Sequence, residues 1–157
     1  MGRSMPSHQA KSRSKARAAA RLAAVQALYQ HEMEAVSIPA LLHEFHNHRL
    51  GAVIEDVEYA EADIAFFDDI VTGVHERRDE IDRIIAGKLS ADWTLDRLDK
   101  PMRQILRAGT YELMARKDVP VGAAISEYLD VTDAFYDRRE KGFVNGILDA
   151  IAKEVRG

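Results

Sequence analysis

Hydrophobic residues recur every three or four positions along most of this chain, which is the spacing of helices that bury one face. The first such segment begins after Ser14, a residue suited to capping a helix N-terminus. Its hydrophobic stripe consists of Ala18, Leu22, Val25, Tyr29 and Met33. We therefore predict a first helix from about residue 14 to residue 33.

The same spacing continues to the C-terminus. A second helix is expected from Ser37 to near Gly51, and the longest periodic segment covers residues 59–89. Pro101 and Pro120 each suit the first turn of a further helix. A last helix carries Val144, Ile147, Leu148, Ile151 and Val155 on one stripe, after a break at the RREKG sequence. No segment alternates like a β-strand, so we predict an all-α domain of six or seven helices.

Charge is distributed unevenly along the 157 residues, a length that suits one domain. The first 21 residues contain six basic residues and no acidic one, whereas the remainder contains 16 basic and 26 acidic residues. Arg13, Arg17 and Arg21 lie four residues apart, so they would repel one another on a helix unless an anion lay across them. We predict a disordered basic arm at residues 1–13 and a single domain at 14–157. The asymmetry indicates a nucleic-acid contact or, alternatively, a solvated tail.

Several classes of protein are disfavoured. Without cysteine the chain has no disulfide, thiolate metal site or thiol nucleophile. It contains neither an uninterrupted apolar stretch of about 18 residues nor an apolar signal segment, so we expect a cytoplasmic protein that contacts no membrane. No phosphate-binding glycine loop or nucleophile elbow is present. His43 and His46 could share a zinc ion, but we expect a solvated helix end, and neither cofactor nor metal.

Two aromatic residues are candidates for contact with an unpaired base. Trp93, in a predicted loop over residues 93–98, could stack on a base or simply pack on the core. Phe143 lies between the RREKG sequence and Asn145, so it could stack on a base or staple the start of the last helix. Gly142 and Gly146 suggest close helix packing or a ligand near the backbone.

Five segments in one order and spacing make the chain resemble the NusB family of bacterial transcription factors. They are AVQALYQ, FFDDIVTGV, ILRAGTYEL, DVPVGAAISEYLDVTDAF and KGFVNGILDAI, within residues 17–153. The resemblance implies two small helical bundles sharing a core, and no enzymatic activity. It also implies binding of single-stranded boxA RNA together with NusE, a small-subunit ribosomal protein. The pair would support ribosomal RNA transcription in the RNA polymerase antitermination complex. Some members self-associate, so a homodimer is possible.

The resemblance assigns roles to individual residues. Arg17 and Arg21 match the arginine-rich start of the first helix, and Phe143 and Asn145 lie in the FVNG segment that contacts RNA in the family. The expected RNA-binding residues are Arg13, Lys15, Arg17, Arg21, Lys141, Phe143 and Asn145. We expect them to form one cationic ridge that adjoins Phe143.

Tyr29 matches a tyrosine at the NusE contact. Relatives often place an acid where this chain has Met102, and we expect Asp96 or Asp99 to take its place. Glu112 matches the family as well and is expected to be structural. Two other readings stay open: a helical adaptor that binds only protein, and a stand-alone relative of the N-terminal domain of ribosomal RNA cytosine methyltransferases.

Overall fold

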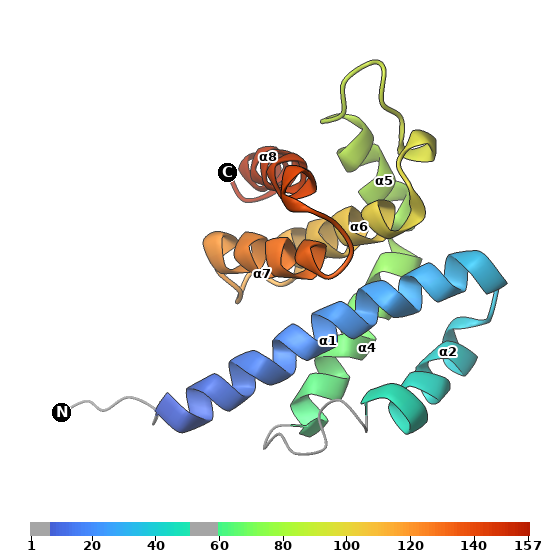
Figure 1. Cartoon of the computed structure of the whole chain (residues 1–157), viewed down its shortest axis with the longest axis vertical. Coiled ribbons are helices and arrows are strands. Elements are labelled where there is room, and N and C mark those ends of the chain that lie inside the picture. Colours follow the sequence, from blue (N-terminus) through green and yellow to red (C-terminus); the bar gives the residue numbers. More distant parts are fainter. Residues whose placement is uncertain (1–6, 51–59) are drawn as a thin grey trace.

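The protein is helical throughout the part of the chain that the computed structural model describes, which is the backbone of residues 7–50 and 60–157 and the side chains of residues 14–47 and 64–157. This part contains seven α-helices, two short helices of other types and no strand, which confirms the predicted all-α fold (Figure 1). The helices are α1 (Ser7–Glu34), α2 (Ile38–Glu44), the π-helix η1 (Phe45–Leu50), α4 (Ala60–Glu76), α5 (Arg78–Ala86), the 3₁₀-helix η2 (Leu95–Arg97), α6 (Lys100–Ala115), α7 (Val121–Asp133) and α8 (Arg138–Val155).

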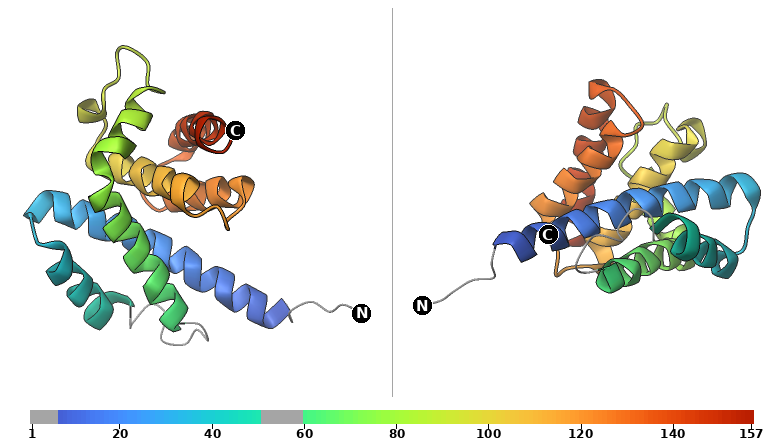
Figure 2. Two further views of the ribbon diagram at one scale, coloured as in Figure 1. Left: turned by 180° about the vertical axis from the view of Figure 1, so that it is seen from behind. Right: turned by 60° about the horizontal axis from the view of Figure 1, so that its bottom comes forward.

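The helices form two bundles that share a core. In the first, α1 packs against α4, α2 and η1, and in the second, α5, α7 and α8 surround α6. Helices α1 and α4 cross in the lower part of Figure 1, with α6, α7 and α8 above them, and the view from behind in Figure 2 agrees. Helix α6 also contacts α1 and α4, so it belongs to both bundles. This central position explains why α6 is buried almost all round from Met102 to Leu113.

Close packing between α4 and α6 depends on one glycine. A Cβ atom on Gly73 would overlap the ring of Tyr111, so only glycine lets that ring lie against α4. The Tyr111 hydroxyl then donates a 2.7 Å hydrogen bond to Asp69. In the first bundle, the rings of Phe45 and Phe67 stack with centroids 5.4 Å apart, which attaches η1 to α4.

Three boundaries differ from those predicted. Helix α1 begins at Ser7, so residues 7–13 of the expected disordered arm are helical. The segment 59–89 is divided at Arg77, whose φ of −109° and ψ of 21° interrupt the helix between α4 and α5. Helix α8 begins at Arg138, so the RREKG sequence forms its first turns instead of preceding it. Charged residues cover the exposed face of a helix as readily as they fill a loop, and their presence alone therefore located the boundary wrongly.

No helix in the described part of the chain has the length and apolar character needed to cross a membrane.

Candidate functional site

One of the predicted RNA-binding arginines is buried in the shared core. Arg21 is 4% exposed. Its Nε donates to Glu112 Oε1 at 2.9 Å and its Nη2 donates to Glu112 Oε2 at 2.6 Å. Glu112 is fully buried and also accepts a 2.8 Å hydrogen bond from the Tyr128 hydroxyl. This network joins α1, α6 and α7, and it confirms the expected structural role of Glu112.

The electrostatics of this network favour its charged, hydrogen-bonded form. Burial raises the pKa of Tyr128 well above its ordinary value, and the charge of Glu112 acts in the same direction. Burial alone would lower the pKa of Arg21, but the hydrogen bond and charge of Glu112 outweigh it, so the net shift is upwards. Arg21 therefore stays protonated and Tyr128 stays neutral. A direct contact between Arg21 and RNA stays a prediction. In the structure, the N–H groups of the Arg21 guanidinium face the carboxylates of Glu112 and Glu127.

Arg17 lies one turn earlier on α1 and is in a different environment. Its guanidinium stacks 4.5 Å from the centroid of the Phe66 ring, and the guanidiniums of Arg21 and Arg116 lie 4.9 Å from the same centroid. Arg116 is paired with Asp69 and Asp118, each at 3.1 Å. Arg17 has no carboxylate within ion-pair distance in the described part of the chain. Burial, followed by the charge of Arg116, lowers the pKa of Arg17.

Phe66 therefore holds a cation that has no ion-pair partner among the side chains the structure describes. Stacking on an aromatic face fixes a guanidinium while leaving its N–H edge available to a phosphate. Lys15, two residues earlier, is exposed, which extends the basic surface along α1. The side chain of Arg13 lies outside the described residues. Sequence reasoning missed Phe66 and Arg116, although the aromatic pair in FFDDIVTGV was visible as a signal.

Phe143 lies elsewhere, in a hollow of about 470 Å³ between the loop after α5 and the start of α8. The hollow is lined by Trp93, Arg97, Leu98, Asp99, Met102, Arg139, Glu140 and Phe143. Sequence reasoning proposed Trp93 and Phe143 separately, and the structure places them in one site. It did not propose Arg139, which becomes visible as a candidate only once α8 is known to begin at Arg138.

The expected single ridge is wrong. Phe143 lies at the start of α6, beside Met102, whereas Arg17 shares a ring with Arg116 just beyond the end of that helix. Arg116 lies 14 positions after Met102, which is about 21 Å at 1.5 Å per residue. The basic part of α1 and the Phe143 hollow are thus two separate surfaces, because α6 lies lengthwise between them.

The remaining candidates on α8 occupy another face of that helix. Residues two positions apart on an α-helix point in nearly opposite directions, so Asn145 faces away from the Phe143 hollow. Asn145 is exposed. Lys141 forms a 3.1 Å ion pair with Asp133 of α7. A Cβ on Gly142 or Gly146 would meet nothing within 4 Å, so the suggestion that these glycines mediate close helix packing is wrong.

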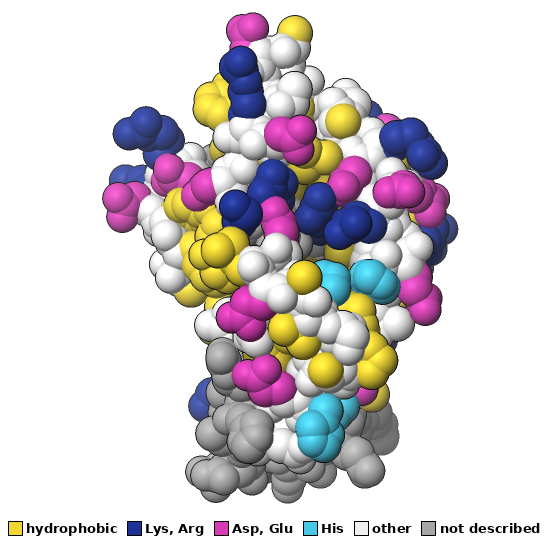
Figure 3. Space-filling model, turned by 90° about the vertical axis from the view of Figure 1, so that its right-hand side faces the viewer, with side chains coloured by type: hydrophobic (Ala, Val, Ile, Leu, Met, Phe, Trp, Pro, Cys, Tyr) yellow, Lys and Arg dark blue, Asp and Glu magenta, His cyan; other side chains and the backbone are white. Residues whose placement is uncertain are grey.

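The predicted partner-binding residues lie together. Tyr29, Asp96 and Asp99 line one groove of about 370 Å³ between the C-terminal half of α1 and the start of α6. Met33, which is 53% exposed, lines it as well. The molecular face at this end of α1 carries hydrophobic side chains among charges of both signs (Figure 3). Such a mixed surface is typical of a protein–protein contact.

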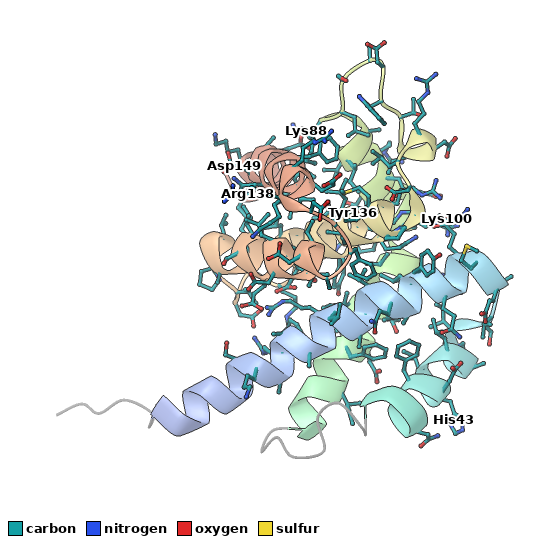
Figure 4. The ribbon with its side chains drawn as sticks, in the orientation of Figure 1. His43, Lys88, Lys100, Tyr136, Arg138 and Asp149 are labelled. Atoms are coloured by element: carbon teal, nitrogen blue, oxygen red, sulfur yellow. The ribbon has the colours of Figure 1, made fainter. Side chains whose placement is uncertain are left out.

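This groove adjoins the Phe143 hollow, since Leu98 and Asp99 line both. Asp99 accepts a 2.6 Å hydrogen bond from the Tyr136 hydroxyl, which fixes the carboxylate at the boundary. In Figure 4, Tyr136 lies between Arg138 at the start of α8 and Lys100 at the start of α6. Met102 is 4% exposed and lines the hollow. Asp96 is the exposed carboxylate at the groove, 4.0 Å from Arg103, whereas Asp99 is already hydrogen-bonded to Tyr136. Contact of either residue with a partner stays a prediction.

His43 and His46 make local contacts. His46 Nε2 lies 2.6 Å from Asp68 Oδ1, and the His43 ring lies within hydrogen-bond distance of Asn47. His43 projects from the outer end of α2 (Figure 4). Among the side chains the structure describes, no three metal-binding residues lie close enough to hold an ion.

Comparisons with known proteins all point to the same family. A model of the NusB family matches residues 18–153. A curated relative from Sphingopyxis alaskensis, the transcription antitermination protein NusB, is 66% identical over 144 residues, which cover 92% of this chain and 97% of the relative. The solved structure of NusB from T. maritima is 32% identical, covers 88% of this chain and 91% of its own, and superposes with a TM-score of 0.69. A structure of the antitermination factors NusB and NusE in complex with dsRNA is 26% identical to this chain. The match covers 92% of this chain and 98% of the chain in that structure, with a TM-score of 0.72.

Proposed function

This chain belongs to the NusB family, and on that premise we propose that it supports transcription antitermination by binding boxA single-stranded RNA together with NusE. Support comes from the relatives named as antitermination proteins and from the structural neighbour that combines NusB, NusE and RNA. The observation that carries the proposal is that the first half of α1 carries Arg17, a cation without an ion pair among the described side chains, and its second half borders the groove of Tyr29, Asp96 and Asp99.

The cation is Arg17. RNA binding by a cationic surface is driven by phosphate contacts that release counterions, so it requires basic groups without internal partners. Arg17 meets this requirement, whereas Arg21 is already paired with Glu112. Phe66 keeps the Arg17 guanidinium fixed, which reduces the entropy lost when a phosphate binds. We therefore assign phosphate binding to Lys15 and Arg17, and assign Arg21 the task of supporting Phe66 from the core.

The groove is the proposed NusE site. Tyr29 and Met33 supply apolar contact area, and the fully exposed Asp96 supplies a negative charge that a basic ribosomal protein would meet. Because the groove adjoins the Phe143 hollow, a bound partner would lie next to any RNA in that hollow. The pair would then present a longer RNA surface than either protein alone, so each should raise the affinity of the other.

In this proposal the protein acts by binding and has no catalytic step. It would work in the cytoplasm, within the antitermination complex of RNA polymerase. Residues 14–157 would form the RNA-binding domain, with the basic segment before them as an extension. A homodimer formed through either surface would compete with RNA or NusE, which sedimentation with and without these ligands would detect.

The proposal can be tested by fluorescence anisotropy of labelled boxA RNA, with scrambled RNA as the reference, in the presence and absence of NusE. We expect tighter binding of boxA than of scrambled RNA, and a further gain with NusE. Equal affinity for both RNAs under both conditions would refute the proposal. Binding of NusE without any binding of RNA would instead identify a protein adaptor.

The variant Arg17→Ala tests the phosphate contact. Loss of one cation should reduce the slope of log affinity against log salt by about 0.7 for a single strand. Arg83→Ala is the matched control, because Arg83 is an exposed arginine on α5 with no ion pair in the described part of the chain. We expect the control to keep the original slope. The assignment of Arg17 would be rejected if its variant also kept that slope.

A further inference from the structure

We propose that the hollow between Trp93 and Phe143 is a nucleotide-binding pocket, which holds one unpaired base of the RNA between the two aromatic side chains and a phosphate beside Arg139. This proposal rests on the proposed function and deepens it. It adds Trp93, Arg97, Arg139 and Glu140 to the RNA-binding residues and gives Phe143 a defined partner. It also makes the pocket a site separate from the phosphate contacts of α1.

The exposure of Trp93 is the first reason. Its side chain is 51% exposed, although an indole is among the most costly side chains to leave in water. In the described part of the chain, Met33 is the other large hydrophobic residue exposed to this degree, and Met33 lines the neighbouring groove. Trp93 therefore offers an open aromatic face in a concave site, which is what a stacked base requires.

The shape of the site is the second reason. The volume of about 470 Å³ lies within the range of small-ligand sites. Its apolar floor consists of Leu98 and Met102, which are 7% and 4% exposed and belong to the core. The loop is held by backbone hydrogen bonds, from Trp93 N to Ser90 O at 2.9 Å and from Arg97 N to Thr94 O at 3.0 Å. The floor and the loop that carries Trp93 are therefore in place without a ligand.

The polar groups at the rim are the third reason, and they distinguish a nucleotide from a purely apolar occupant. Arg139 is exposed and has no carboxylate within ion-pair distance in the described part of the chain. Arg97 donates to the Asp92 carbonyl at 3.0 Å through one nitrogen, which leaves its other donors available. Glu140 also lines the hollow, and its carboxylate can accept a hydrogen bond from the amino group of a base. Aromatic walls, cations and one acceptor together match a base with its phosphate.

The chain offers a direct probe, because Trp93 is its single tryptophan. The full-length protein should be titrated with a boxA oligoribonucleotide while tryptophan fluorescence and the anisotropy of labelled RNA are measured in parallel. We expect quenching that follows the anisotropy curve. Trp93→Ala should weaken binding by about 5- to 150-fold, since stacking of one base contributes ~1–3 kcal/mol, and Trp93→Phe should retain most of the affinity. Arg83→Ala, at an exposed position on α5 that lines neither the hollow nor the groove, is the control and should bind RNA normally.

Oligonucleotides with an abasic site at each position in turn then locate the stacked base. One abasic position should abolish the quenching, and with that oligonucleotide Trp93→Ala should cause no further loss. Unchanged fluorescence on boxA binding, with full affinity in Trp93→Ala, would overturn the pocket while leaving the proposed function intact. Quenching by NusE in the absence of RNA would assign the hollow to a protein side chain and also overturn it. A failure of boxA to bind at all would reject the proposed function together with the pocket.

Discussion

The buried pair of Arg21 and Glu112 gives the sharpest test of how the two bundles are joined. Glu112→Gln keeps the shape of the side chain but removes its charge. The buried guanidinium of Arg21 would then face a neutral amide. Glu127 lies 3.4 Å from the Arg21 guanidinium and would compensate only in part. Removing one partner of a buried ion pair costs about 3–5 kcal/mol, and the remaining carboxylate places this variant near the lower end.

For a chain of this length, each kcal/mol lowers the melting temperature by about 2–4 °C. We therefore expect Glu112→Gln to melt roughly 6–12 °C below the parent, with a loss of about 3 kcal/mol in urea unfolding followed by circular dichroism. Glu127→Gln is the control, because its partly exposed carboxylate should contribute less than about 1 kcal/mol.

A double-mutant cycle with Arg21→Met separates the ion pair from simple loss of packing. The double variant leaves no unpaired buried charge, so it should be more stable than the sum of the two single changes predicts, by at least about 1 kcal/mol. The reasoning fails if Glu112→Gln lies within about 0.5 kcal/mol of the parent, or if the two changes are additive.

Two further predictions concern glycine and tyrosine. Gly73→Ala should destabilise the fold by about 1–3 kcal/mol because the new methyl group overlaps the Tyr111 ring. Gly146→Ala lies in open space on α8 and should stabilise the fold by about 0.5–1 kcal/mol. Thermal melts in which both variants shift the melting temperature in the same direction would contradict this. Burial, assisted by the hydrogen bond to Asp69, raises the pKa of Tyr111 from 10.0 to about 12. The neutral hydroxyl therefore stabilises the folded state fully below pH 10, and this stabilisation is lost between pH 10 and 12. Tyr111→Phe should lose less stability than the parent across that interval, and a phenolate of Tyr111 that forms near pH 10 in ultraviolet difference titration would refute the assignment.

The sequence was sufficient wherever the determining interactions are local. Helical spacing identified the all-α class, and Pro101 and Pro120 marked the starts of α6 and α7 to within one residue. The order of five short segments identified the family, since many separate matches rarely coincide by chance. Local rules were weaker at Arg77 and Arg138, where a bend or an early start depends on packing against other helices.

The tertiary structure decided which residues are available to a ligand. Arg17 and Arg21 are equivalent by spacing and charge, yet Arg21 is paired with Glu112, 91 positions away in the sequence. Arg17 stacks on Phe66 and has no ion pair among the described side chains. Likewise, Phe143 shares its site with Trp93 from a distant loop and not with its near neighbour Asn145. Periodicity reports only which side of a helix faces inward. Ion pairs and hollows depend on which helices meet there, and the free energy of those long-range contacts cannot be deduced from any one segment.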